Sequence, residues 1–186
     1  MNLYPKLQQR DAEKNPIRIG MIGAGKFGSM FLAQANRLPG IHVVGIADLN
    51  PANAQSNLAY VGWPVEKYNA TSLDNAVKTG TSFVGDDWLA LVNHPAIDMI
   101  IECTGDPIAA VHHVITAFKH GKNVINATVE ADAFCGAGLN QAAIDAGVVY
   151  SMAYGDQPAL TCELVDWART CGFKVVAAGR GHKWLA

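Results

Sequence analysis

Apolar residues recur along this chain in two alternating periods, which predict strands and helices in turn. Residues 17–23 (IRIGMIG) form a short apolar run with β-branched side chains that closes on glycine, which is typical of a buried strand. From residue 25 the period becomes helical, with Phe31, Leu32 and Ala35 on one face. The same reasoning predicts further strands over residues 41–47, 81–84, 98–103, 123–126, 148–152 and 173–178.

Helices are predicted between these strands, and two of them have a recognisable beginning. Asn50 and Asp106 suit the N-cap position, and each is followed by a proline, Pro51 or Pro107, which suits the first helical turn. An amphipathic helix at about 2–15 is expected before the first strand. The helix after Pro107 has its apolar face at residues 111–118, and the remaining helices are expected around residues 72–77, 86–92, 135–146 and 160–171.

This alternation of strands and helices predicts the fold class. Strands joined by helices form right-handed βαβ units, and these build a parallel sheet with helices on both faces. The central strands are apolar throughout, as a sheet covered on both faces requires. We therefore predict a doubly wound α/β fold, a Rossmann-type dinucleotide-binding domain over residues 1–186.

A glycine-rich loop follows the first predicted strand and fits the G-x-G-x-x-G pattern. The pattern alone is weak because glycines often mark turns, but a position between the first strand and its helix is the context that a dinucleotide site requires. Gly23 would make the tight turn, Gly25 would let a pyrophosphate approach the backbone, and Gly28 would let helix and strand pack closely. A plain tight turn is the alternative. The cofactor-binding candidates of this loop are Gly23, Ala24, Gly25, Lys26, Phe27 and Gly28.

An acidic residue at the end of the second strand indicates which dinucleotide would bind. Asp48 lies 20 residues beyond Gly28, where a carboxylate can accept hydrogen bonds from the adenosine ribose. It would repel a 2′-phosphate, and the residues that follow include no arginine to bind one. This favours NAD, with NADP as the less favoured cofactor. The alternative role for Asp48, a cap of the following helix, is compatible with the first.

The ends of two later strands should face the same crevice, because ligands of open α/β sheets bind outside the carboxyl ends of the strands. Thr104 and Gly105 would line the nicotinamide-ribose side, and Asn126 and Glu130 would flank the nicotinamide. Ordinary helix capping is the alternative for residues 104–106. A first-turn charge favoured by the helix dipole is the alternative for Glu130.

Composition and charge exclude several classes of function. With 186 residues, 50% hydrophobic and 16% charged, the chain can bury one sizeable core. Lys plus Arg number 14 against 16 Asp plus Glu, which argues against a nucleic-acid partner. The chain has no apolar run of membrane-spanning length and a polar N-terminus without a signal peptide, so we expect a cytoplasmic protein without a membrane partner.

Cysteines and histidines add little chemistry at this stage. Cys103, Cys135, Cys162 and Cys171 lack the spacing of a metal site, so no metal is expected and they are interpreted as reduced packing residues. His112 and His113 are neighbours on a predicted helix and are expected at its surface or boundary.

Five segments together resemble a known family: IRIGMIGAGKFGSM, DMIIECTGDP, GKNVINATVEAD, YSMAYGDQPAL and VVAAGRGHKW. They are similar to the N-terminal part of SAF-domain-containing, homoserine-dehydrogenase-like oxidoreductases, a group with a reductoisomerase-like branch. The resemblance runs from about residue 3 to 183. It implies nicotinamide-dependent oxidoreduction of a small polar substrate, phosphorylated ones included. It also implies that the catalytic, dimerising and SAF regions of such proteins are missing from this chain.

Catalytic candidates follow from the need for a proton donor or acceptor near the oxygen of the reacting carbon. Lys183 could serve as acid/base and Arg180 as an anion clamp, because both follow the last predicted strand. Glu130 and Asp156 could hold polar groups of the substrate. For each of these residues a solvated surface position is the alternative.

Two functional hypotheses remain. The first is the cofactor domain of an NAD(P)-dependent oxidoreductase acting on CH–OH groups of a small-molecule substrate, and the second is a non-catalytic dinucleotide sensor. We expect the chain to bind cofactor without turnover, because the eight residues after the last predicted strand are too few to close a substrate cleft. Surplus apolar surface, including Trp184 and Leu185, should favour a homo-oligomer.

Overall fold

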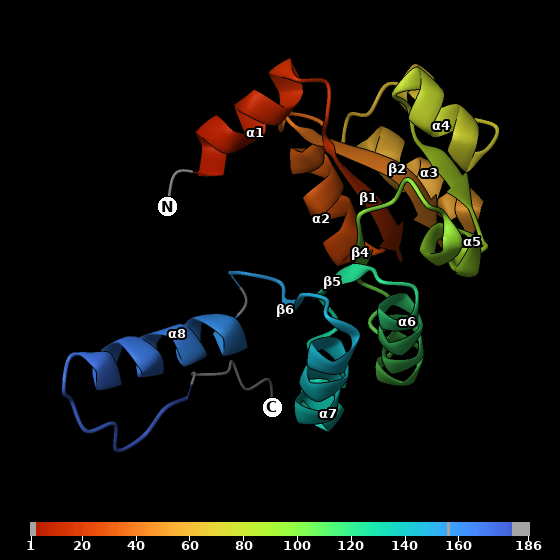
Figure 1. The fold of residues 1–186 in the computed structure, drawn as a ribbon. Coiled ribbons are helices and arrows are strands. Elements are labelled where there is room, and N and C mark those ends of the chain that lie inside the picture. Colours follow the sequence, from red (N-terminus) through yellow and green to blue (C-terminus); the bar gives the residue numbers. More distant parts are fainter. Residues whose placement is uncertain (1–2, 156, 180–186) are drawn as a thin grey trace. The chain divides into compact units, whose positions relative to one another are not determined.

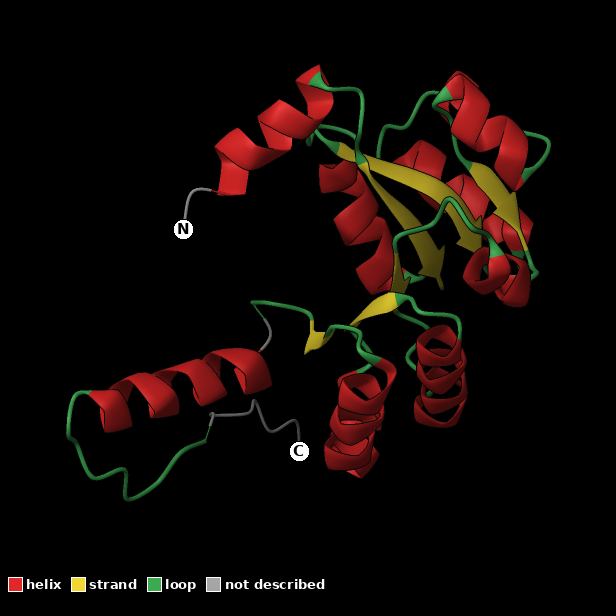
Figure 2. Ribbon diagram, viewed as in Figure 1, coloured by secondary structure: helices red, strands yellow, loops and turns green. Residues whose placement is uncertain are grey.

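The computed structural model describes residues 3–155 and 157–179, and it divides the chain into two compact units, Met1–Tyr150 and Ser151–Ala186 (Figures 1 and 2). The elements are α1 (Leu3–Ala12), β1 (Ile17–Ile22), α2 (Lys26–Ala35), β2 (Ile41–Ala47), α3 (Pro51–Tyr60), the 3₁₀ turn η1 (Val65–Lys67), α4 (Leu73–Thr79), β3 (Phe83–Gly85), α5 (Trp88–Asn93), β4 (Met99–Glu102), α6 (Pro107–Lys119), β5 (Asn123–Asn126), α7 (Val129–Ala146), β6 (Tyr150–Met152) and α8 (Gln157–Thr170).

The strands form one parallel sheet in the order β3-β2-β1-β4-β5-β6, which confirms the predicted doubly wound α/β fold. β1 lies between β2 and β4, and its last residue, Ile22, pairs with Ala47 on one side and Glu102 on the other. The strand order reverses at this point, because β1 to β3 extend the sheet in one direction and β4 to β6 in the other. The carboxyl ends of β1, β2 and β4 therefore meet at a topological switch point, where ligands of such sheets bind.

Helices cover both faces of the sheet, and alternate strand residues enter two separate cores. Ile22 packs among side chains of α4, α5, α6 and α7, whereas Ile19 and Met21 pack among side chains of α2 and α3. The largest fully buried side chains of the two cores include Leu91, Val92, Ile100, Val114 and Leu139 on the first face, and Leu32, Ile46 and Leu58 on the second.

The caps that the sequence predicts are present. The Asn50 side chain accepts a hydrogen bond from the N–H of Asn53, and the Asp106 side chain accepts from the N–H groups of Ile108 and Ala109. These bonds satisfy N–H groups that the first turns of α3 and α6 leave without a helical partner. Local capping chemistry therefore positions two helices whose N-termini lie beside the strand ends.

The predicted strand at residues 173–178 is wrong. The described residues after α8 have no regular secondary structure, and Phe173 and Val176 are largely exposed. A strand needs a hydrogen-bonded neighbour, and no strand within the described residues pairs with this segment. The packing role expected for Cys162 and Cys171 is also wrong, because both are exposed, whereas Cys103 is buried as predicted.

We expect Ile100→Ala to lower the free energy of unfolding by about 3 kcal/mol, because it removes a buried side chain from the middle of β4 and leaves a cavity. Ile100 is 0% exposed, whereas Ile108, the matched control in α6, is 69% exposed. Ile108→Ala should change stability by less than about 0.5 kcal/mol. Urea unfolding of both variants tests this expectation, and equal losses would contradict the placement of the core.

Candidate functional site

The glycine loop turns sharply at the carboxyl end of β1. Gly23 has a φ of +90°, and a Cβ at this position would lie 2.8 Å from the carbonyl oxygen of Cys103. Both the backbone conformation and the lack of space therefore require glycine. The N–H of Gly23 donates to the carbonyl of Ala47 at the end of β2 (2.8 Å). Gly23 thus makes the predicted tight turn, and Gly25 follows as the N-cap of α2.

Asp48 ties this loop to the end of β2. One oxygen of its carboxylate accepts a hydrogen bond from the N–H of Ala24 (2.8 Å), and the other accepts from the N–H of Asn50 (2.9 Å). The N-cap of α3 is the side chain of Asn50, so the alternative that Asp48 itself caps this helix is wrong. Asp48 instead orients the glycine loop and lines the adjacent pocket.

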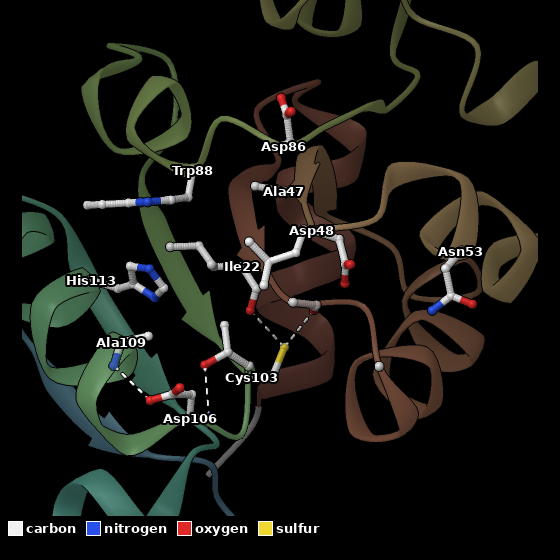
Figure 3. A pocket seen from close by; sticks show the side chains of 14 residues that line it. Ile22, Ala47, Asp48, Asn53, Asp86, Trp88, Cys103, Asp106, Ala109 and His113 are labelled. Atoms are coloured by element: carbon white, nitrogen blue, oxygen red, sulfur yellow. Dashed lines mark hydrogen bonds between the residues drawn. The ribbon is translucent and has the colours of Figure 1, made fainter.

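A pocket of about 410 Å³ opens at the switch point (Figure 3). Asp48, Asp86 and Asp106 belong to its lining, and the described residues that line it include no lysine or arginine. Figure 3 places Trp88 and His113 across the pocket from Asp48 and Asn53. The lining residues are Ile22, Gly23, Gly25, Ala47, Asp48, Leu49, Asn53, Asp86, Trp88, Cys103, Thr104, Asp106, Ala109 and His113.

His113 is a pocket residue, and the prediction of a surface or boundary position for it is wrong. It is 7% exposed, and its ring packs against Trp88 with ring centroids 4.5 Å apart. On α6 it shares a face with the buried residues Ala110 and Ala117. Helical spacing of three and four residues relates these positions, so the apolar pattern around His113 was the signal that could have placed it.

Sequence reasoning also missed Glu102, the last residue of β4. This side chain is fully buried, and its carboxylate bonds to the hydroxyls of Thr104 and Thr128 and lies 3.3 Å from Nδ1 of His113. A glutamate within the apolar run MIIEC was the available signal. A buried carboxylate is costly unless it is hydrogen-bonded, so such a residue indicates a specific polar network.

Asn126 belongs to a second polar network, at the end of β5. It is fully buried, its side chain exchanges hydrogen bonds with the backbone of Thr128, and its Nδ2 donates to the hydroxyl of Tyr150 (3.0 Å). Burial raises the pKa of the Tyr150 phenol, which donates to Asp132 (3.0 Å). Asn126 is not among the pocket-lining residues.

The other candidates have different positions. Gly23, Gly25, Asp48 and Thr104 line the pocket, and Gly105 follows Thr104 in the same loop. Glu130 is exposed in the first turn of α7 and does not line the pocket. The predicted site residues Asp156 and Lys183 lie outside the described residues, as do Arg180, Trp184 and Leu185.

The loop fits a dinucleotide. A Cβ built on Gly25 would meet no protein atom within 4 Å, although this residue lines the pocket at the beginning of α2. Gly28, by contrast, faces Met21 and the carbonyl of Gly23 at 2.5 and 2.8 Å. Open space at the second glycine and close packing at the third are what a pyrophosphate beside a helix N-terminus requires.

Comparison with known proteins identifies the family. A family model described as an oxidoreductase family with an NAD-binding Rossmann fold matches residues 17–126, more than half of the chain. The chain belongs to this oxidoreductase family. A second model, the catalytic domain of oxidoreductase DRL, matches residues 155–186 of this family member. No curated protein matches the sequence.

Solved structures of other oxidoreductases share the fold. A homoserine dehydrogenase from Thiobacillus denitrificans is 24% identical with a TM-score of 0.58, over 77% of this chain and 30% of its own. An NAD binding oxidoreductase from Klebsiella pneumoniae is 22% identical with a TM-score of 0.57, over 84% of this chain and 39% of its own. Biliverdin reductase from Synechocystis, in complex with biliverdin and NADP+, is 18% identical with a TM-score of 0.55, over 84% of this chain and 43% of its own. The chain thus spans less than half the length of these relatives.

No helix within residues 3–155 and 157–179 combines the length and apolarity that crossing a membrane requires.

We expect Gly28→Ala to destabilise the protein by about 1–3 kcal/mol, because the new methyl group would collide with backbone that cannot move away. Gly25→Ala is the matched control: its methyl group enters open space, and its φ of −70° suits alanine. Thermal unfolding of both variants tests this difference. If Gly28→Ala were as stable as Gly25→Ala, the close packing of α2 on β1 would be refuted.

Proposed function

We propose that this chain forms the NAD-binding part of an oxidoreductase that transfers a hydride to or from a CH–OH carbon of a small polar substrate, phosphorylated substrates included. The observation that carries this proposal is the glycine loop at the switch point, which Asp48 holds at the edge of a pocket. Membership of the NAD-binding oxidoreductase family supports it.

The residues present suggest how NAD would be held. The N–H groups of residues 25–28, at the N-terminus of α2, would bind the pyrophosphate. Asp48 would bind the adenosine ribose, and Thr104 and Gly105 would face the nicotinamide-ribose side. When bound, the nicotinamide supplies the hydride acceptor or donor. The protein supplies the binding and orientation.

The lining of the pocket supports NAD over NADP. Three acidic residues, Asp48, Asp86 and Asp106, line it, and no lysine or arginine is among the lining residues that the structure describes. A 2′-phosphate would add negative charge where no side-chain cation of the lining could compensate it. A ribose hydroxyl, in contrast, can donate a hydrogen bond to Asp48.

The finer classification is also a proposal. Similarity to a homoserine dehydrogenase structure and the DRL catalytic-domain match at residues 155–186 support a place near the homoserine-dehydrogenase-like, SAF-containing group. Within that proposal Lys183, Asp156 and Glu130 remain candidates for contacts with the substrate. We also propose that the complete protein is a homo-oligomer.

We expect Gly25→Val to abolish NADH binding while the protein stays folded, because the side chain fills the space that the pyrophosphate needs. The lack of neighbours within 4 Å of the Gly25 Cβ position makes this substitution selective for ligand binding. Isothermal titration calorimetry with NADH, alongside thermal unfolding, measures both effects. Unchanged affinity would mean that the loop is a turn without a ligand.

We expect Asp48→Asn to weaken NADH binding by about 1–2 kcal/mol, because a neutral amide accepts the ribose hydrogen bonds less strongly. The same change should narrow the preference for NADH over NADPH. Asp145→Asn, at an exposed position of α7, changes the net charge equally and should leave both affinities unchanged. A stronger binding of NADPH than NADH by the unaltered chain would overturn the role of Asp48.

A further inference from the structure

A buried carboxylate lies at the carboxyl end of β4. Glu102 is 0% exposed, and within residues 3–155 and 157–179 no lysine or arginine forms an ion pair with it. His113, with its Nδ1 3.3 Å from Oε1, is its ion-pair candidate. Burial of a carboxylate without a cation requires strong hydrogen bonds to both oxygens.

Two threonine hydroxyls from loops far apart in the sequence supply these hydrogen bonds. Oγ1 of Thr104 lies 2.6 Å from Oε1 of Glu102, and the backbone N–H of Thr104 donates to the same oxygen at 3.3 Å. Oγ1 of Thr128 bonds to Oε2. Each oxygen of the carboxylate therefore has its own hydroxyl partner.

The direction of both hydroxyl protons follows from a second bond that each threonine makes. Oγ1 of Thr104 accepts from the N–H of Asp106 (3.3 Å), and Oγ1 of Thr128 accepts from the N–H of Gly105 (3.0 Å). A hydroxyl has one proton, and an N–H group cannot accept it, so both protons point to Glu102. Every hydrogen bond of the network is thus formed when both oxygens of Glu102 accept a hydrogen bond from a threonine hydroxyl.

This network fixes the loop that follows β4. Thr104, Gly105 and Asp106 have their N–H groups bound within it, directly or through a threonine hydroxyl. Gly105 has a φ of +76°, so its backbone conformation differs from that of its neighbours and depends on such bonds. Thr104 lines the pocket, whereas Glu102 does not.

In the proposed function, residues 104 and 105 face the nicotinamide ribose. On that basis we infer that Glu102 is a positioning residue for the nicotinamide half of the cofactor. Its carboxylate holds Thr104 directly and Gly105 through Thr128. It acts without contacting the cofactor. The adenosine and pyrophosphate contacts proposed for Asp48 and the glycine loop involve no residue that bonds to this carboxylate.

The test compares NADH with ADP, which has the adenosine and pyrophosphate but lacks the nicotinamide and its ribose. In Glu102→Gln an amide NH₂ replaces one acceptor oxygen, so one threonine hydroxyl loses its partner. We expect the dissociation constant for NADH to rise about tenfold and that for ADP to change less than about twofold. Calorimetry on the whole chain measures both, and Glu66→Gln, an equal charge change at an exposed position of η1, should leave both unchanged.

A second pair of variants tests the same network if Glu102→Gln does not fold. Thr128→Val keeps the shape of the side chain but removes the hydroxyl between Glu102 and Gly105, and Thr128→Ser keeps the hydroxyl. Thr128 is 1% exposed and does not line the pocket, so neither variant alters a direct cofactor contact. Valine should reproduce the selective loss of NADH affinity, and serine should retain affinity close to that of the unaltered chain.

The outcomes separate the two proposals. Unchanged NADH affinity in both Glu102→Gln and Thr128→Val would overturn the positioning role. An equal loss of NADH and ADP affinity would also overturn it, because a general structural defect does not distinguish the halves of the cofactor. If the unaltered chain bound no NADH, the proposed function itself would fail and this inference with it.

Discussion

The site depends on the close approach of two backbones, that of Gly23 after β1 and that of Cys103 after β4. A Cβ on Gly23 would lie within 2.9 Å of backbone atoms of Cys103 and Thr104. The thiol of Cys103 donates to the carbonyl of Gly23 (3.0 Å), and burial raises its pKa, so it stays a neutral donor. The N–H of Cys103 also donates to the carbonyl of Ile22 (2.9 Å), so β1 and β4 are paired to their ends. The close approach thus lies where the glycine loop, Asp48 and Thr104 share one edge of the sheet.

Polar side chains are concentrated at the end of the sheet, where the apolar cores stop. Glu102 and Asn126 are the last residues of β4 and β5, and both are fully buried. Thr128 bonds to both of them, through its hydroxyl to Glu102 and through its backbone to Asn126. Parallel strands end with backbone groups that lack a sheet partner, and these side chains organise the loops that have to satisfy them. The network is therefore a structural link between the loops after β4 and β5.

Local signals in the sequence predicted the fold and part of the site, because each depends on near neighbours in the chain. The caps at Asn50 and Asp106 and the turn at Gly23 are of this kind. The bonds of Glu102 to Thr128 and His113 depend instead on residues 26 and 11 positions away, which apolar periodicity does not reveal. The wrong strand at residues 173–178 has the same origin: its apolar pattern was present, but a strand also needs a neighbour to pair with.

An acidic pocket lining is compatible with an anionic cofactor because most of its negative charges already have partners. Asp106 accepts from two N–H groups of α6, and Asp48 accepts from Ala24 and Asn50. The pyrophosphate would meet the free N–H groups at the beginning of α2, where the helix dipole favours negative charge and Lys26 adds a cation. The helix dipole would favour one diphosphate at that point, but its effect falls off within the first turn and would not reach a further phosphate on a ribose bound at Asp48. Under the proposed function, the same geometry would therefore favour NAD over NADP.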